Sequence, residues 1–161
     1  EGGVLRNLDS SYEWNPNREK RSHTTLKLKP MDDDDWPVIG FTQGTGGKDV
    51  GALMWVLETN QTIVDGLNKK RKLNYHILPT PEDNKFNSVT KGMTYDQRYA
   101  AFRYLTEHPE YFETKLKGKL MRVQFSIISN YGKPQQPKVL GFRDLDLNIE
   151  FFKHVDTTMN R

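Results

Sequence analysis

The sequence predicts a mainly β fold, a small Greek-key β-barrel with one helix. Short apolar or alternating segments are separated by turn residues such as Gly, Asn and Pro, as in small all-β domains. One segment alone has helical spacing of its apolar residues, and it stands between earlier and later strand candidates. The 161 residues, 35% hydrophobic and 11% aromatic, suit one folded domain, or one domain plus a piece of another.

Residues 1–29 contain two strand candidates, Gly3–Leu5 and Thr24–Leu28. Apolar and basic residues alternate in the second, so Lys27 and Lys29 would share one face of a strand. Two short strands cannot bury a core. This region therefore requires structure from elsewhere.

A proline and four consecutive acids make Pro30–Asp35 a predicted solvated linker that does not pack. Residues 60–85 are polar, basic and contain prolines, which predicts a loop or an insertion. Gly44–Lys48 predicts a flexible connection, and it lacks the full P-loop pattern. The strand candidates after the linker are Val38–Phe41, Gly51–Glu58, Phe86–Val89, Lys119–Ser129 and Lys138–Phe142.

The helix is predicted to begin after Thr94, because Thr94 and Gln97 form a capping box. It is predicted to end at His108-Pro109. Its apolar stripe consists of Tyr95, Tyr99, Phe102 and Leu105. Short strands with one helix before the last two strands are typical of an OB-fold, a five-stranded Greek-key barrel.

The formal net charge is +3, but the basic residues are unevenly distributed. Between Lys115 and Arg143 there are seven basic residues and no acidic one. A local basic strip suits a track for a phosphate backbone, and a solvated sheet face explains it about as well. The candidate DNA-binding residues are Lys115, Lys117, Lys119, Arg122, Lys133 and Lys138.

The absence of cysteine excludes disulfides and thiolate metal sites, and it suits an intracellular protein. The four histidines lack metal-ligand spacing. No apolar run reaches the ~20 residues of a membrane helix, so no membrane is expected as a partner. Nothing in the sequence distinguishes nucleus, cytoplasm or a viral factory.

Three motifs in the first forty residues resemble those of covalent nucleotidyltransferases, the family of DNA ligases, RNA ligases and mRNA capping enzymes. Glu1–Arg6 resembles the motif EG-x-[VIM]-[LV]-[RK]. Arg21-Ser22 followed by Leu26–Lys29 resembles the ligase pattern R-S-x-x-L-L-K-x-K. Asp33–Ile39 resembles the acidic segment D-x-E-x-x-I that precedes the OB domain, with Asp35 in the glutamate position.

The remainder resembles the OB domain of ATP-dependent DNA ligases over Val38–Leu57, Phe86–Arg98 and Met121–Arg143. This resemblance, over roughly residues 1–146, implies that residues 1–31 are the last strands of an adenylation domain. That domain is an α+β nucleotidyltransferase (ATP-grasp-like) domain. Residues 32–148 would then be the OB-fold domain and 149–161 a tail, in which Ile149, Phe151 and Phe152 could pack as a last short element.

The resemblance also implies an activity. An ATP-dependent DNA ligase seals nicks in duplex DNA through lysyl-adenylate and DNA-adenylate intermediates, in replication, repair and recombination. Lys27, Lys29 and Arg143 would be catalytic: the lysines would meet the phosphate of AMP, and Arg143 would orient the pyrophosphate of ATP. Arg6 and Glu1 would also bind the nucleotide, with Glu1 holding Mg²⁺, which prefers carboxylate oxygen.

Two features depart from the ligase pattern. The sequence has no K-x-D-G, so the nucleophilic lysine would lie in a missing N-terminal adenylation domain or in a chain carrying it, and this chain would not be active alone. Asp146 stands where a lysine is usual, which puts the pyrophosphate contact in doubt. Two alternatives remain open: an mRNA-capping or RNA-ligase relative, and a non-catalytic OB module that binds nucleic acid. The lack of cysteine argues against the NAD-dependent ligases.

Overall fold

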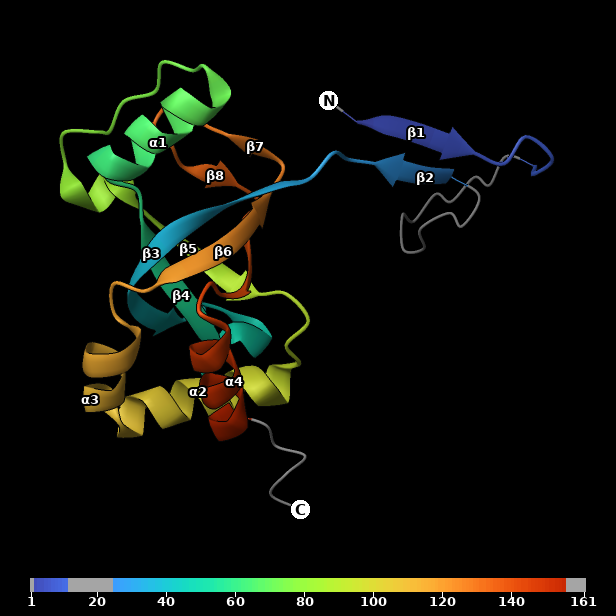
Figure 1. Cartoon of the computed structure of the whole chain (residues 1–161). Helices are drawn as coiled ribbons and strands as arrows, with labels where there is room; N and C mark the ends of the chain where they lie inside the picture. Colours follow the sequence, from blue (N-terminus) through green and yellow to red (C-terminus); the bar gives the residue numbers. More distant parts are fainter. Residues whose placement is uncertain (1, 12–24, 156–161) are drawn as a thin grey trace. The chain divides into compact units, whose positions relative to one another are not determined.

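The computed structural model describes residues 2–11 and 25–155. The chain divides into two compact units, residues 1–31 and 32–161 (Figure 1). Three residues named in the sequence motifs, Glu1, Arg21 and Ser22, lie outside the described residues. Within the described part of the chain, no helix is long and apolar enough to cross a membrane.

The first unit is a two-stranded antiparallel hairpin of β1 (Gly3–Arg6) and β2 (Thr25–Leu28). Gly3 pairs with Leu28 at one end of the register. A Cβ atom on Gly2 would lie 1.8 Å from the carbonyl oxygen of Leu28, so the residue preceding β1 must be glycine for this pairing to form.

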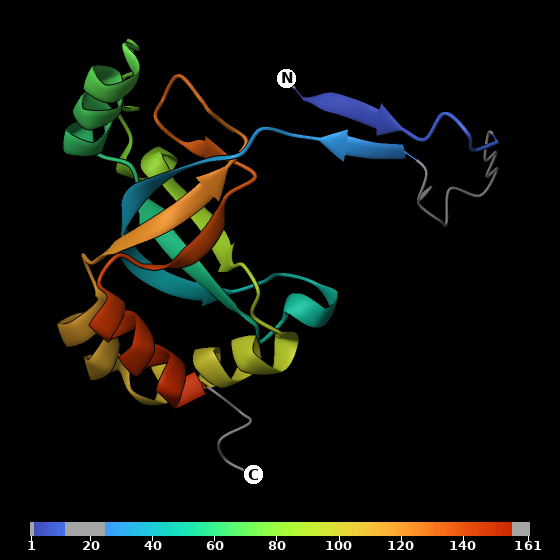
Figure 2. The ribbon, with the colours of Figure 1, turned by 45° about the vertical axis from the view of Figure 1, so that its right-hand side comes forward.

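The second unit contains a closed five-stranded barrel in the order β3-β4-β5-β9-β6 (Figure 2). All neighbouring strands are antiparallel except β5 and β9, which are parallel. The order and the single parallel pair are consistent with an OB-like fold. The strands are β3 (Asp32–Gln43), β4 (Leu53–Glu58), β5 (Lys85–Thr90), β6 (Leu120–Phe125) and β9 (Lys138–Phe142), with a small hairpin of β7 (Ile127–Ile128) and β8 (Pro134–Gln135).

The chain is a mixture of strand and helix, so the expectation of a mainly β chain with one helix was wrong in its helix content. Helix α1 occupies one end of the barrel, and α2, α3 and α4 gather at the other (Figures 1 and 2). The helices are α1 (Gln61–Arg71), α2 (Tyr95–Glu107), α3 (Pro109–Tyr111) and α4 (Leu145–Val155), with short helical turns at Gly47–Asp49, Pro81–Asn84 and Phe112–Leu116.

Helix α1 falls in the region 60–85, which the sequence predicted as a loop or insertion. Its N-cap is Asn60, whose side chain accepts a hydrogen bond from the Ile63 backbone amide. The helix buries only Val64 and Leu67. Because so few apolar residues recur, the helical period is weak in the sequence.

The predicted helix is confirmed as α2. Thr94 and Gln97 form the expected capping box, and Leu105 is fully buried. Tyr95, by contrast, is 42% exposed, and its ring lies 5.0 Å from the guanidinium carbon of the buried Arg98.

Two tryptophans form the centre of the barrel core. Trp36 packs edge-on against Phe86 and Phe125, and Trp55 packs against Phe151. The indole Nε1 of Trp55 donates a hydrogen bond of 2.9 Å to the Thr90 hydroxyl. Residues 149–155, expected to begin a tail, form the second half of α4, which carries the buried Phe151 into this core.

The connection Gly44–Lys48 was expected to be flexible, but α2 holds it. Arg98 Nη1 lies 2.9 Å from the carboxylate of Asp49, which directly follows this connection. The Tyr99 hydroxyl donates a hydrogen bond to the Lys48 carbonyl. Side chains distant in sequence therefore fix a glycine-rich loop that looks unconstrained in the sequence.

Candidate nucleic-acid interface

The four aspartates predicted to form a linker are instead the first four residues of β3, paired with β6 from Asp32↔Phe125 to Asp35↔Arg122. Successive side chains of a strand point to opposite faces, so the four aspartates alternate between the inner and the outer face of β3. Asp32 and Asp34 are on the same face as the buried Trp36, and Asp33 and Asp35 are on the outer face.

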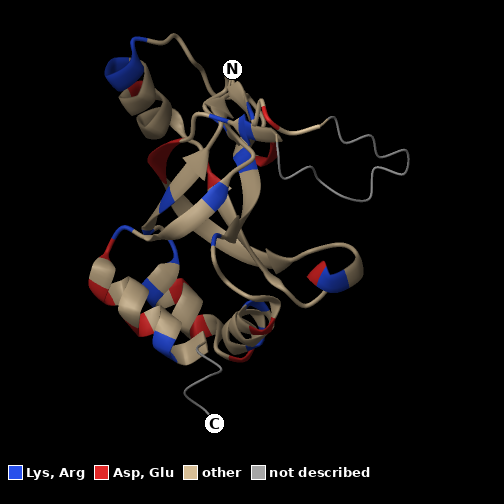
Figure 3. Cartoon of the chain, turned by 90° about the vertical axis from the view of Figure 1, so that its right-hand side faces the viewer, with Lys and Arg blue, Asp and Glu red and all other residues tan. Residues whose placement is uncertain are grey.

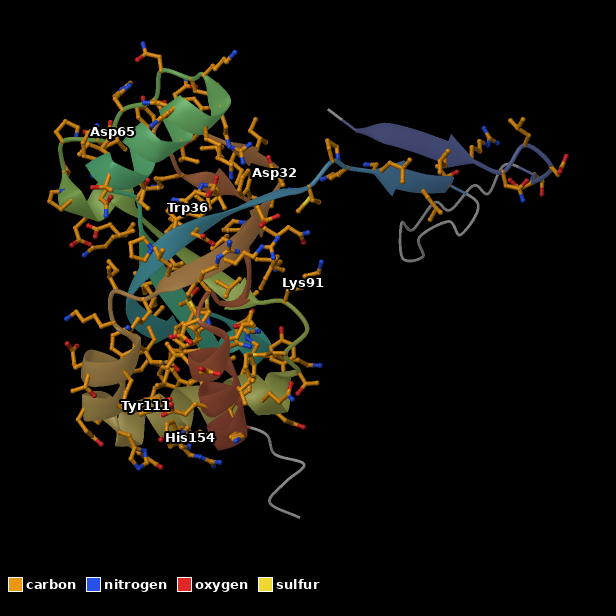
Figure 4. All side chains as sticks on the ribbon, viewed as in Figure 1. Asp32, Trp36, Asp65, Lys91, Tyr111 and His154 are labelled. Atoms are coloured by element: carbon orange, nitrogen blue, oxygen red, sulfur yellow. The ribbon has the colours of Figure 1, made fainter. Side chains whose placement is uncertain are left out.

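The inner pair of aspartates anchors helix α1. Asp34 lies 3.1 Å from Lys70 Nζ and 3.6 Å from Arg71 Nη2. Asp32 accepts a hydrogen bond from Arg71, whose guanidinium also lies 5.4 Å from the centre of the Phe125 ring. The hydrogen bond from Arg71 lowers the pKa of Asp32 below its ordinary value. Figure 4 shows Asp32 at the start of β3.

The outer pair holds two arginines. Arg122 donates a hydrogen bond from Nε to Asp33, and Arg143 Nε lies 3.6 Å from Asp35. The hydrogen bond from Arg122 lowers the pKa of Asp33, and the same bond raises the pKa of Arg122. Asp33 and Arg122 are therefore both charged at neutral pH.

Two lysines extend this surface across β6 and β9. Lys91 Nζ donates a hydrogen bond of 2.9 Å to the side-chain oxygen of Gln124, and Lys138 is the register partner of Gln124. Directly opposite residues on antiparallel strands point to the same face. We call this outer surface the β6–β9 face; it consists of Lys91, Arg122, Gln124, Lys138 and Arg143. Figure 3 shows basic residues on the barrel strands beside the acidic start of β3.

This face has the chemistry to bind a phosphate backbone. Four cations face solvent with two carboxylates, and Gln124 adds a neutral donor. The arginine–aspartate pairs are exposed enough that water or a phosphate oxygen can compete for the guanidinium. Contacts to phosphate are made mainly by such side chains.

The six residues predicted to bind DNA do not form one strip. Lys115, Lys117 and Lys119 would share one face only in an extended segment, but Phe112–Leu116 is helical and Gly118 turns with φ of +80°. Lys117 pairs with Glu113 at 2.9 Å. Only Arg122 and Lys138 of the six belong to the β6–β9 face. Lys133 lies at the end near α1, where its Nζ donates to the Asp83 carbonyl.

Sequence reasoning missed Lys91 and the two outer aspartates. Lys91 follows β5, and its backbone amide donates to the Val139 carbonyl at 2.7 Å, which sets it beside β9 (Figure 4). Lys91 comes beside β9 because β5 and β9 pair in parallel, a pairing that the sequence does not indicate. The position of Asp33 and Asp35 could have been predicted from the sequence. Trp36 and Val38 alternate with less buried residues, and extending this alternation back to residue 32 puts Asp33 and Asp35 on the outer face of the barrel.

The predicted nucleotide-binding residues of the first unit lie on the hairpin. Val4 is the register partner of Lys27, and Arg6 that of Thr25, so Arg6 and Lys27 share one face. Lys29 follows the end of β2 and is exposed. The opposite face carries Leu5, Leu26 and Leu28, each more than half exposed. Two neighbouring cations suit a phosphate group. Among the described residues, no group of three His, Cys, Asp or Glu could hold a metal ion.

No protein-family model matches the chain. Among curated proteins, it is similar to DNA ligases of African swine fever virus, including isolates Tick/South Africa/Pretoriuskop Pr4/1996 and Warthog/Namibia/Wart80/1980. Each is 36% identical over 145 residues, which cover 89% of this chain and 29% of the relative. The chain thus spans less than a third of the length of these relatives. The similarity confirms the resemblance to DNA ligases seen in the motifs.

Two solved structures are more distantly similar. One is described as Pmar-Lig_Pre., with 22% identity and a TM-score of 0.47 over 78% of this chain and 24% of the other. The second comes from a structure–function analysis of Lig E DNA ligases, with 19% identity and a TM-score of 0.42 over 76% of this chain and 34% of the other.

Proposed function

We propose that this chain, a relative of DNA ligases, is the C-terminal part of an ATP-dependent enzyme that seals nicks in duplex DNA. The main support is the β6–β9 face, where cations from three separate parts of the sequence meet on one side of an OB-like barrel. The sequence similarity names the enzyme class, and the face supplies a surface that suits its substrate.

On the β6–β9 face, Arg122, Lys138 and Lys91 would contact phosphates of the duplex that flanks the nick. Double-stranded DNA carries about one negative charge per 1.7 Å, so several cations within one face can contact it together. Gln124 keeps Lys91 in place through their hydrogen bond and can itself donate to a phosphate oxygen.

ATP, with Mg²⁺, would supply the adenylyl group whose transfer activates the 5′-phosphate at the nick. Arg6, Lys27 and Lys29 would neutralise charge around its phosphates, because ligation moves negative charge about phosphorus at every step. Arg143 would orient the pyrophosphate, for which it must leave Asp35. Its backbone amide is held by the Leu120 carbonyl at 2.9 Å, so only the side chain needs to move.

Asp146 has a structural role that accounts for its departure from the usual lysine. It stands in the first turn of α4, where a negative charge is favourable beside the positive end of the helix dipole. Asp144 begins the same turn and accepts a hydrogen bond of 3.1 Å from the Leu147 backbone amide. In this chain, Asp146 would therefore stabilise α4 instead of contacting the pyrophosphate.

The test is nick sealing by this chain mixed with the separately produced adenylation domain of the same gene, which would carry the K-x-D-G lysine. We expect sealing to require both components and ATP, and to fall when Lys29 is changed to Ala. The matched control is Lys153→Ala, an exposed lysine of α4. No sealing, or an equal decrease in both variants, would contradict the proposal.

Binding measurements separate the remaining alternatives. A ligase component should prefer nicked duplex DNA to single strands of the same sequence. Tight binding to single-stranded DNA with no preference for nicks would instead favour a non-catalytic OB module. Preference for RNA 5′ ends would favour a relative of RNA ligases or capping enzymes.

A further inference from the structure

The C-terminal end of α1 is a second basic surface, outside the β6–β9 face. Four consecutive basic residues occur there, Lys69 to Lys72. Lys72 caps the helix in the left-handed conformation with φ of 53°, and its amide donates to the Asn68 carbonyl. The Asn68 side chain in turn holds Tyr75 through two hydrogen bonds. These hydrogen bonds fix the C-terminal end of α1.

Of these four basic residues, only the two in the middle form ion pairs within the described residues. Lys70 and Arg71 pair with Asp34 and Asp32, as described above. Lys69 and Lys72 are exposed, and within the described residues neither has an ion-pair partner. Lys69 lies in the last turn of α1 and Lys72 at its cap, so two exposed ammonium groups lie at one end of the helix.

The turn between β7 and β8 packs against the first half of α1, at the same end of the barrel, and carries further polar groups (Figure 1). A Cβ on Gly132 would lie 2.7 Å from Val64, so α1 and the turn touch closely there. The Thr59 hydroxyl also donates to the Gly132 carbonyl at 3.1 Å. Tyr131, beside it, is 40% exposed and meets the ring of His76 edge-on at 5.2 Å.

Lys133 completes the turn. Its Nζ donates a hydrogen bond of 2.7 Å to the carbonyl of Asp83, a neutral partner that leaves its charge uncompensated. This end of the barrel (Figure 1) thus carries the cations Lys69, Lys72 and Lys133 and the hydroxyl of Tyr131. Lysine and tyrosine side chains are common donors to the phosphates of DNA.

This second surface adjoins the first at the start of β3. Asp32 binds Arg71 of α1, and the next residue, Asp33, binds Arg122 of the β6–β9 face. Arg71 and Arg122 therefore bind adjacent residues on the two faces of one short stretch of strand. We infer that the end of α1 and the β7–β8 turn form a second contact with the phosphate backbone of duplex DNA, lengthening the track of the β6–β9 face.

This inference rests on the proposed function, and the test separates the two. The chain is titrated with fluorescently labelled nicked duplex DNA at several salt concentrations, and affinity is read from anisotropy. The variant is Lys69→Gln with Lys72→Gln. Removing one cation that neutralises a phosphate should lower the slope of log affinity against log salt by about 0.9, so the double variant should reduce the slope by about 2.

The matched control is Arg103→Gln with Lys153→Gln, two exposed residues of α2 and α4 at the other end of the barrel. It removes the same charge, and it should leave the slope almost unchanged because neither residue lies near the proposed track. Equal slopes for the two double variants would overturn the inference. Thermal unfolding of both, with midpoints like that of the parent chain, establishes that neither is misfolded.

A third variant, Arg122→Gln with Lys138→Gln, tests the β6–β9 face separately. If it weakens binding while the α1 variant matches the control, the second contact is refuted and the proposed function stands. If the parent chain shows no affinity for nicked duplex DNA, the proposed function fails as well.

Discussion

Arg122 of β6 donates its Nε hydrogen bond to the carboxylate of Asp33 on the adjacent strand β3. A residue that the sequence suggested as a DNA contact thus already has an anionic partner in the protein. The pair is exposed, with 47% of the Arg122 side chain and 36% of the Asp33 side chain accessible. Exposed ion pairs contribute little to stability, so a DNA phosphate can replace the aspartate at small cost.

Replacing Asp33 with Asn should strengthen DNA binding. The change keeps the shape of the side chain but removes the charge that competes with phosphate for Arg122. We expect higher affinity for duplex DNA and a salt dependence steeper by about 1, since one more cation becomes available. Glu107→Gln, which removes an exposed negative charge at the end of α2 on the opposite end of the barrel (Figure 1), is the control. Unchanged affinity in Asp33→Asn would show that Arg122 does not contact the backbone.

The ion pair between Asp32 and Arg71 should make stability depend on pH in the acid range. The folded-state pKa of Asp32 lies below its ordinary value of 3.8, mainly through the hydrogen bond from Arg71. Its stabilisation is therefore complete above pH 3.8 and is lost as the pH falls through the folded-state pKa. Asp32→Asn should cost about 1 kcal/mol or less at neutral pH.

Chemical denaturation of the parent chain and of Asp32→Asn at a series of pH values measures this effect. The difference between their free energies of unfolding should shrink as the pH falls below 3.8. A difference that stays constant into strong acid would mean that the charge of Asp32 contributes nothing.

Tyr111 should give the opposite, alkaline dependence. Burial, followed by the charge of Glu150, raises its pKa from 10.0 to about 12. Tyr111 meets His154 edge-on at 5.3 Å, where α3 and α4 come together (Figure 4). Because the folded state holds the phenol proton more tightly, the associated stability is complete below pH 10 and is lost as the pH rises toward 12.

Ultraviolet titration of tyrosine ionisation checks this value, with Tyr111→Phe as the comparison. The difference spectrum between the two proteins should show one phenol ionising near pH 12. An ordinary value near 10 for that phenol would mean that Tyr111 does not pack against α4 in solution.

Local sequence patterns predicted the elements that depend on local chemistry. The capping box of Thr94 and Gln97 predicted the start of α2, and the strand candidate Lys119–Ser129 contains β6, whose alternate residues Met121, Val123 and Phe125 are buried. The candidate was too long at its end: β6 stops at Phe125, and Ile127, which is 55% exposed, belongs to the β7–β8 hairpin.

Elements that depend on partners distant in sequence were not predictable in this way. Four adjacent aspartates are unfavourable in an isolated strand, and they form one here because Lys70, Arg71, Arg122 and Arg143 reach them from α1, β6 and the segment after β9. The β6–β9 face likewise depends on the parallel pairing of β5 with β9, which no local pattern indicates. The sequence predicted the residue types of the site but not their neighbours.

Phe151 should be essential for the stability of the barrel, although it lies in the predicted tail. It is 1% exposed, and its ring centre lies 5.4 Å from that of Trp55 and 5.9 Å from that of Phe142. Phe151→Ala would leave a cavity beside Trp55 and should cost about 3–5 kcal/mol. Ile149→Ala on the same helix is the control, because Ile149 is 56% exposed and should cost well under half as much.

Thermal unfolding of the two variants and of a chain lacking residues 148–161 provides the measurement. The deletion should lower the midpoint at least as much as Phe151→Ala, since it removes both Phe151 and the buried Val155. For a domain of this size, about 3–5 kcal/mol corresponds to a shift of roughly 10 °C or more. An unchanged midpoint after the deletion would mean that α4 is not part of the folded barrel. The packing of Phe151 on Trp55 would then contribute nothing to stability.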